Sequence, residues 1–192
     1  MASTISPETG ADAGMDADAR AGTDTRSRAD ARIGADARFM RGRLSRWIAL
    51  GFGSGLSPRA PGTVGTLWAW LAFVVADAWL DPRHWALVLP VAFLIGIWAC
   101  GRTARDLGVA DHGAIVWDEI VAFWLVLVIV PGGWAQQLAA FVLFRFFDIV
   151  KPPPIRHYDE KLKNGFGVMF DDLLAAFYTL FAVALFSALA GA

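Results

Sequence analysis

Five carboxylate side chains stand beside long apolar runs in this sequence, and their types and spacing suggest metal chemistry. They occur in three places along the chain, namely Asp118 with Glu119, Asp148 alone, and Asp171 with Asp172. Clustered carboxylates repel one another and raise one another's pKa unless a cation lies among them. Hard oxygen ligands, without cysteine and with at most one histidine, suit Mg²⁺, which binds one or two carboxylates and keeps water or phosphate as further ligands. The sequence therefore predicts a Mg²⁺ site if the fold unites the three places.

Two cationic side chains accompany one of these acids in the stretch FRFFDIVKPPP, residues 144–154. If the stretch is helical up to the prolines, Arg145, Asp148 and Lys151 follow at intervals of three and share one face. Three charges facing lipid or a dry core would be costly, so we expect them to face one another, a cavity or a charged ligand. Arg145 and Lys151 would then hold phosphate oxygens. The alternative is a buried Arg145–Asp148 ion pair that only fixes helix register.

The segment GFGSGLSPRAPGTVGTL, residues 51–67, is rich in Gly, Pro, Ser and Thr and leads into an apolar run. Its glycines allow close approach of the backbone, and a helix beginning near Pro61 would offer free N–H groups to a phosphate. It is not a Walker loop, because no Lys follows the last Gly. The plainer alternative is a flexible loop with a Thr cap. The residues assigned to substrate binding here are Ser57, Gly62, Thr63, Gly65 and Thr66.

Each doubled carboxylate is expected to open an apolar helix. Asp118 and Glu119 do so in DHGAIVWDEIVAFW, and Asp171 and Asp172 do so in GFGVMFDDLLAAFY. One acid of each pair could serve only as a helix cap, since acids suit the positive end of the helix dipole. Both members cannot cap, so Glu119 is expected to point toward other helices. His112 is expected to be a hydrogen-bonding turn residue rather than a ligand.

Five apolar runs must position these side chains. Each run is somewhat shorter than the roughly 20 residues that cross a bilayer comfortably, so they are either thin spans or helices of a bundle partly sunk in the membrane. Pro90 predicts a kink in the second run. The runs cover residues 63–80, 84–100, 120–130, 134–150 and 173–190.

The distribution of basic residues predicts how these runs are oriented. Arginines and lysines gather before the first run and after the second and fourth, whereas the first and third connections hold almost none. By the positive-inside rule, the N-terminus and the second and fourth connections are cytoplasmic, and five crossings leave the C-terminus outside. The polar segments 51–66, 102–119 and 145–172 then share the cytoplasmic side. This predicts one composite site at that face.

Composition agrees with a membrane protein. Apolar residues make up 56% of the chain and charged residues only 18%, with a positive mean hydropathy of +0.47. Soluble domains are usually nearer half apolar and a quarter charged. The net charge of -1 gives no indication of a nucleic-acid partner. Residues 1–40, built from Ala, Asp, Arg, Gly, Ser and Thr, are predicted to be a disordered tail before a helical domain at 41–192.

Together, the stretches GFGSGLSPRAPGTVGTL, DHGAIVWDEIVAFW, FRFFDIVKPPPI and GFGVMFDDLLAAFY resemble the phosphatidylglycerophosphatase A family, over about residues 50–178. The resemblance implies an all-α, compact, membrane-associated bundle of about five or six helices in the bacterial inner membrane. It also implies a Mg²⁺-dependent phosphatase that removes the terminal phosphate of phosphatidylglycerophosphate and leaves phosphatidylglycerol. The partners are then a phospholipid substrate and the bilayer.

These expectations combine into a mechanistic hypothesis. Mg²⁺ is held by some of Glu119, Asp148, Asp171 and Asp172, with Asp118 close by, and the attacking group is either a bound water or a carboxylate that forms an aspartyl-phosphate. The alternative function is a membrane cation transporter or channel that uses the same acids as an ion site. Acids at helix ends and the lack of an internal repeat favour the phosphatase. The catalytic residues assigned are Asp148, Asp172, Arg145 and Lys151.

Overall fold

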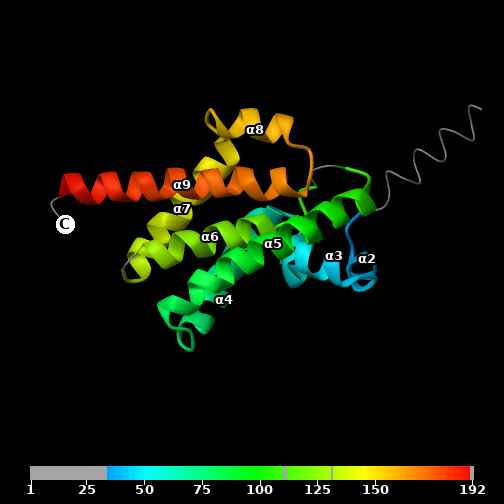
Figure 1. The fold of residues 1–192 in the computed structure, drawn as a ribbon, viewed down its shortest axis with the longest axis horizontal. Helices are drawn as coiled ribbons and strands as arrows, with labels where there is room; N and C mark the ends of the chain where they lie inside the picture. The colour runs from blue at the N-terminus through cyan, green and yellow to red at the C-terminus, as the bar shows by residue number, and fades with distance from the viewer. Residues whose placement is uncertain (1–33, 110–111, 131, 191–192) are drawn as a thin grey trace, which may run out of the picture. The chain divides into compact units, whose positions relative to one another are not determined.

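The computed structural model of the protein describes residues 34–109, 112–130 and 132–190, and these residues are mainly helical with no strand among them (Figure 1). The predicted all-α fold is confirmed, although the described helices are more numerous than the five or six expected. Most of the predicted tail, residues 1–33, lies outside the described part. The helices are α2 (Ala37–Arg41), α3 (Leu44–Ala49), the 3-10 helix η1 (Gly51–Leu56), α4 (Pro61–Asp77), α5 (Pro82–Leu107), α6 (Trp117–Ile129), α7 (Trp134–Val150), α8 (Ile155–Lys161) and α9 (Gly165–Ala190).

Each of the five apolar runs lies in a helix of its own. The bounds of α7 agree with the prediction, whereas α5 and α9 are 26 residues long and exceed it. Helix α5 continues through Pro90 to a left-handed glycine cap. The segments Pro82–Leu107 and Gly165–Leu189 are long and apolar enough to cross a membrane. The expectation that every run is too short for a comfortable span is therefore wrong for these two.

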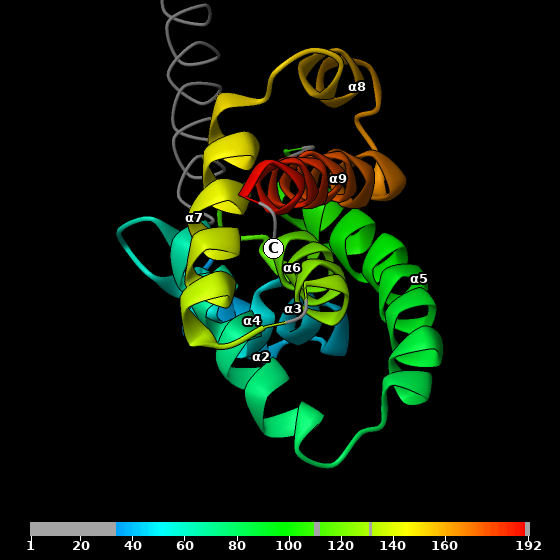
Figure 2. The ribbon, with the colours of Figure 1, turned by 90° about the vertical axis from the view of Figure 1, so that its left-hand side faces the viewer.

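Helix α6 lies in the middle of the bundle, with α4, α5, α7 and α9 around it (Figure 2). Its apolar residues are buried on nearly all sides, as a helix that is apolar all round requires. Two indole hydrogen bonds connect α6 to its neighbours. Trp117 Nε1 donates to the Ala92 carbonyl in α5, and Trp124 Nε1 donates to the Ala69 carbonyl in α4. Phe123, fully buried, packs against Phe144 of α7. The first turn of α6 is therefore held rigidly.

Small residues let the helices that carry the polar segments approach closely. At the crossing of α5 and α9, a methyl group on Gly165 would overlap with the Ile97 carbonyl and the Gly101 backbone. Near the start of α4, a methyl group on Gly65 would collide with Val116, which precedes α6. Glycine is needed at Gly165 because backbone atoms leave no room for a side chain, and at Gly65 because the Val116 side chain fills the space. These contacts bring the polar ends of the helices together.

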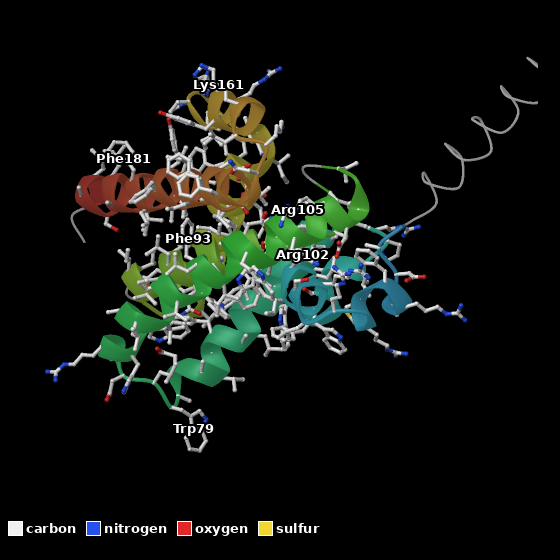
Figure 3. The ribbon with its side chains drawn as sticks, turned by 45° about the vertical axis from the view of Figure 1, so that its right-hand side comes forward. Trp79, Phe93, Arg102, Arg105, Lys161 and Phe181 are labelled. Atoms are coloured by element: carbon white, nitrogen blue, oxygen red, sulfur yellow. The ribbon has the colours of Figure 1, made fainter. Side chains whose placement is uncertain are left out.

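Large apolar side chains cover much of the outer surface of the helices. Trp79 is 86% exposed, Phe186 is 74% exposed and Phe181 is 70% exposed; Trp79 and Phe181 are labelled in Figure 3. Soluble monomers rarely expose apolar surface on this scale. The surface agrees with the two candidate spans and with association of the protein with a membrane.

Candidate active site

One cavity of about 150 Å³ brings together the side chains from the three polar places in the sequence. It lies between the first turn of α6, the last turn of α7 and the second turn of α9. All five carboxylates border it, and Lys151, which follows α7, borders it as well. The acids are Asp118, Glu119, Asp148, Asp171 and Asp172.

The helix starts differ from the prediction at two points. Helix α9 begins at Gly165, where the Asn164 side chain accepts a hydrogen bond of 2.9 Å from Gly167 N, so Asp171 and Asp172 lie inside the helix and neither caps it. Asn164 can cap because its side-chain oxygen satisfies an N–H group that has no partner in the helix. Helix α4 likewise has no Thr cap, because it follows Ala60 in a left-handed conformation, with a φ of 46°. Both acids of the α9 pair are thus available to the cavity.

Ion pairs hold the carboxylates in place. Arg145 Nη1 lies 2.6 Å from an Asp148 oxygen and 3.0 Å from a Glu119 oxygen, so this one guanidinium bridges α7 and α6. Lys151 Nζ donates to Asp171 at 2.6 Å and joins the end of α7 to α9. Arg145 and Asp148 therefore share one face of α7 as predicted, whereas Lys151 follows the helix in a left-handed conformation and pairs with α9 instead. Arg145 does not border the cavity itself, but lies behind the acids that do.

The start of α4 supports one of these acids. Thr66 Oγ1 donates to the Gly62 carbonyl and lies 3.4 Å from a Glu119 oxygen. A methyl group on Gly62 would overlap with the Glu119 carboxylate. Gly62 and Thr66 thus contact the site through Glu119, whereas the sequence predicted direct binding of phosphate by this segment.

None of the five residues assigned to substrate binding in this segment is among those that line the cavity. Ser57 donates to the carbonyl of Arg59, Gly65 packs against Val116, and Thr63 is half-buried on α4. His112 forms a turn as expected, with Nδ1 accepting a hydrogen bond from Ala114 N. Only part of the Gly-rich segment therefore contacts the acids.

The cavity has more negative than positive charge. Asp118, Asp171 and Asp172 are at most 7% exposed, and the only cationic side chains described beside the five acids are Arg145 and Lys151. Burial, reinforced by the charge of Asp148 and opposed by Arg145, raises the pKa of Glu119 to about 7. A raised carboxyl pKa in a small cavity is typical of functional sites. The two described cations therefore do not balance the five carboxylates.

The donor set fits Mg²⁺, although the oxygens do not already form a cage. Among the described Asp, Glu, His and Cys side chains, no group of three or more is arranged to hold a metal ion as it stands. Arg145 and Lys151 hold three of the acids in ion pairs, which accounts for this arrangement. Mg²⁺ needs only one or two carboxylates when water and phosphate complete its shell. Five nearly buried carboxylates around one cavity can meet that requirement.

Part of the cavity wall is apolar and was not predicted. Ile115 and Val168 border the cavity, and both are buried. Tyr178, two turns beyond the acids on α9, donates to the Pro153 carbonyl at 2.8 Å and fixes the segment after Lys151. No sequence signal distinguishes these residues from ordinary core residues, because the fold alone brings them beside the acids.

Comparison with known proteins identifies the family. The family model described as Phosphatidylglycerophosphatase A matches residues 47–187. The chain belongs to the phosphatidylglycerophosphatase A family. The match contains all five carboxylates of the cavity, together with Arg145 and Lys151, whereas residues 1–46 lie outside it.

Individual relatives support membership in the phosphatidylglycerophosphatase A family. A protein with that name from Haemophilus influenzae is 50% identical over 137 residues, which cover 71% of this chain and 84% of the relative. A protein of the same name from Escherichia coli is 44% identical over 129 residues, which cover 67% and 74%. A protein from Bacteroides thetaiotaomicron with the provisional name phosphatidylinositol-3-phosphatase is 42% identical over 145 residues, with 71% and 89% covered. No solved structure matches the chain.

Proposed function

We propose that the protein hydrolyses the terminal phosphate ester of phosphatidylglycerophosphate and so produces phosphatidylglycerol and phosphate during phospholipid synthesis. Membership of its family makes the protein a phosphatidylglycerophosphatase, since two relatives at 44–50% identity carry that name. The single observation that carries the proposal for the site is the cavity where five carboxylates from three helices meet. Because these relatives are phosphatases by name, hydrolysis is preferred to the alternative of cation transport.

Mg²⁺ is the proposed cofactor, held by some of the cavity's five carboxylates. When bound, it would neutralise negative charge on the phosphate and lower the pKa of a bound water. The excess of buried carboxylates over cationic side chains supports this choice, because buried charges need pairing or metal coordination. Asp148 and Asp172 border the cavity from α7 and α9, so both are proposed as ligands of this metal.

The two cationic side chains have different proposed roles. Lys151 borders the cavity, so its ammonium can move from Asp171 to a phosphate oxygen over a short distance. Arg145 lies behind the acids and contacts both Glu119 and Asp148, so it is proposed to position these carboxylates first, and to reach the phosphate only when they move. Lys151 adopts a left-handed backbone with a φ of 45°, a conformation that costs free energy in a non-glycine residue and that recurs at functional sites.

The site is proposed to lie at the cytoplasmic surface of the bacterial inner membrane. A diacyl lipid keeps its tails in the bilayer and presents its phosphate at the interface, where the site must be. The acids lie near the start of α6, the end of α7 and the start of α9, whereas the apolar outer surface continues along the candidate spans. The excess of basic residues in the connections at this end favours the cytoplasmic side.

Phosphate release from phosphatidylglycerophosphate in detergent micelles tests this function. The purified protein is assayed with Mg²⁺ and with a chelator, and glycerol 3-phosphate serves as a soluble phosphate monoester for comparison. We expect Mg²⁺-dependent release that is much faster from the lipid. No release from the lipid under any condition would contradict the proposed activity, and equal rates on both substrates would contradict its specificity for lipid.

A further inference from the structure

A second hollow, with the opposite charge, lies next to the carboxylate cavity. It has a volume of about 420 Å³ and is formed by the last turns of α5 and by the residues that lead into α9. Its polar side chains come from Arg105, Lys163 and Asn164. Among the described residues that line it, none is acidic. We propose that this hollow binds the phosphodiester of the lipid substrate, while the carboxylate cavity takes the terminal phosphate.

The floor of the hollow is bare backbone. It lies where Gly101 of α5 and Gly165 of α9 cross with no side chain between them. A methyl group on Gly101 would lie 4.0 Å from Nη1 of Arg105, so the guanidinium folds back over this crossing. Gly108 adds another wall without a side chain. A ligand that enters the hollow can therefore approach both the glycine backbone and the Arg105 guanidinium, which suits an anionic group.

The hollow and the cavity are neighbours along one face of α9. Gly165 borders the hollow, Val168 borders the carboxylate cavity, and a spacing of three residues places them on the same side of the helix, one turn apart. From Gly165 to Asp171 the helix rises about 9 Å, at 1.5 Å per residue. Before α6, Val109 borders the hollow and Gly113 borders the cavity.

The chemistry of the proposed substrate matches this pair of sites. Phosphatidylglycerophosphate carries a phosphate monoester at one end of a glycerol unit and a phosphodiester at the other. The monoester needs the metal-ligating acids, whereas the diester only needs positive charge and hydrogen-bond donors. This inference rests on the proposed function, and it assigns Arg105 and Lys163 to recognition of the substrate rather than to chemistry.

The chain offers matched controls for both cationic residues. Arg102 lies one turn before Arg105 on α5, and Lys161 lies two residues before Lys163; both controls are exposed and neither lines the hollow. In the view of Figure 3, Arg105 lies nearer to α9 than Arg102 does, and Lys161 projects from α8. Replacing each of the four by Gln removes the same charge from the same end of the molecule. General attraction of anionic lipid would respond to all four changes alike.

The experiment measures kcat and KM for phosphatidylglycerophosphate in mixed micelles, with the R105Q and K163Q variants against R102Q and K161Q. We expect KM to rise about tenfold in each hollow variant, as loss of a charge-assisted contact implies, with kcat within about twofold. The control variants should keep the KM of the unaltered protein. Equal rises in all four variants, or no rise in the hollow variants, would overturn the proposal.

A second measurement separates this inference from the proposed function and from misfolding. Phosphatidylglycerol carries the phosphodiester without the monoester, so it should inhibit the unaltered protein, and its inhibition constant should rise about tenfold in R105Q and K163Q. Turnover of glycerol 3-phosphate, which has no phosphodiester, should stay unchanged in these variants. An equal loss on this substrate would refute a role in binding the diester. If the unaltered protein releases no phosphate from the lipid, the proposed function fails instead.

Discussion

Two ion-pair clusters near the polar end of the molecule have opposite charge balances. In the first, Arg43 and Arg46 of the N-terminal part share Asp106 of α5, and the Arg46 guanidinium also lies 4.0 Å from the centre of the Phe39 ring. In the second, Arg145 and Lys151 face five carboxylates. The first cluster is partly solvated and contains more cations than acids, so it needs no metal ion to balance its charge. The second is more deeply buried and lacks positive charge.

This comparison indicates why only one of the clusters can be an active site. A partly exposed pair contributes little, about 1 kcal/mol or less, and tolerates change. A buried cluster with more acids than cations is costly unless something compensates it, and such clusters are typical of functional sites. The Asp106 cluster is therefore interpreted as a structural contact that holds α3 against α5. The carboxylate cluster is interpreted as the site that binds a metal and phosphate.

The largest effect is expected from D148N. Asn keeps the size of the side chain but removes a negative charge beside Glu119 and Arg145. Loss of a group that stabilises charge at the reacting phosphate commonly costs about 10²–10³ in kcat. We expect a loss of that size in phosphate release at saturating Mg²⁺, with the protein still folded. D106N is the matched control in the other cluster, and its rate of phosphate release should stay within about twofold of that of the unaltered protein. Full activity of D148N would show that Arg145 and Asp148 only fix helix register.

A second comparison concerns stability rather than rate. R145Q leaves Glu119 and Asp148 without their shared cation, and breaking a buried pair by removing one partner costs about 3–5 kcal/mol. R46Q removes a cation from the other cluster, where Asp106 retains Arg43, and should cost about 1–2 kcal/mol with its ring contact included. Chemical denaturation in detergent measures the free energy of unfolding of both variants. Equal losses would remove the distinction between the clusters.

A smaller effect is expected from G62A. The added methyl group would overlap with the Glu119 carboxylate and push it from its position beside Arg145. We expect phosphate release to fall about tenfold, because a displacement of about 1 Å at a site can cost that much or more. G133A places the same methyl group in open space at the start of α7 and should leave the rate unchanged. Unchanged activity of G62A would show that the position of Glu119 is unimportant.

The smallest effect is expected from T66V. Valine has nearly the shape of threonine but loses the hydroxyl that lies 3.4 Å from Glu119. One neutral hydrogen-bond donor contributes about 0.5–1.5 kcal/mol, so we expect a loss of about two- to tenfold in rate. The phosphate-release assay with phosphatidylglycerophosphate measures this loss of rate. A loss as large as that of D148N would mean that Thr66 contacts the substrate directly.

Much of the fold follows from the sequence because the apolar runs are long and clearly bounded. The run 134–150 predicts α7 at both ends, since Gly133 precedes it and Pro152 follows it closely. The start of α9 was not predicted because its first six residues, GFGVMF, contain two glycines and resemble a loop. Asn164 nevertheless caps it. Because Asn164 caps the helix, Asp171 and Asp172 lie in its second turn rather than at its end.

The acids of the site could be predicted, but their partners could only be predicted in part. A spacing of three on one helix is enough to pair Arg145 with Asp148. The contacts of Arg145 with Glu119 and of Lys151 with Asp171 depend on how α6, α7 and α9 pack, which spacing alone does not specify. The close approach of Gly62 to Glu119 depends in the same way on the packing of α4 against α6. The neighbouring basic hollow could not be predicted either, because it depends on how α5 packs against α9.

The central claim is that a divalent cation completes the carboxylate cluster during hydrolysis of the lipid. Its most direct test is phosphate release from phosphatidylglycerophosphate across a range of Mg²⁺ concentrations, with the unaltered protein, D148N and D106N compared after treatment with a chelator. The account predicts no release without metal, saturable activation in the unaltered protein and in D106N, and almost no activation in D148N. Full release in the presence of chelator, or a D148N curve identical to that of the unaltered protein, would contradict it.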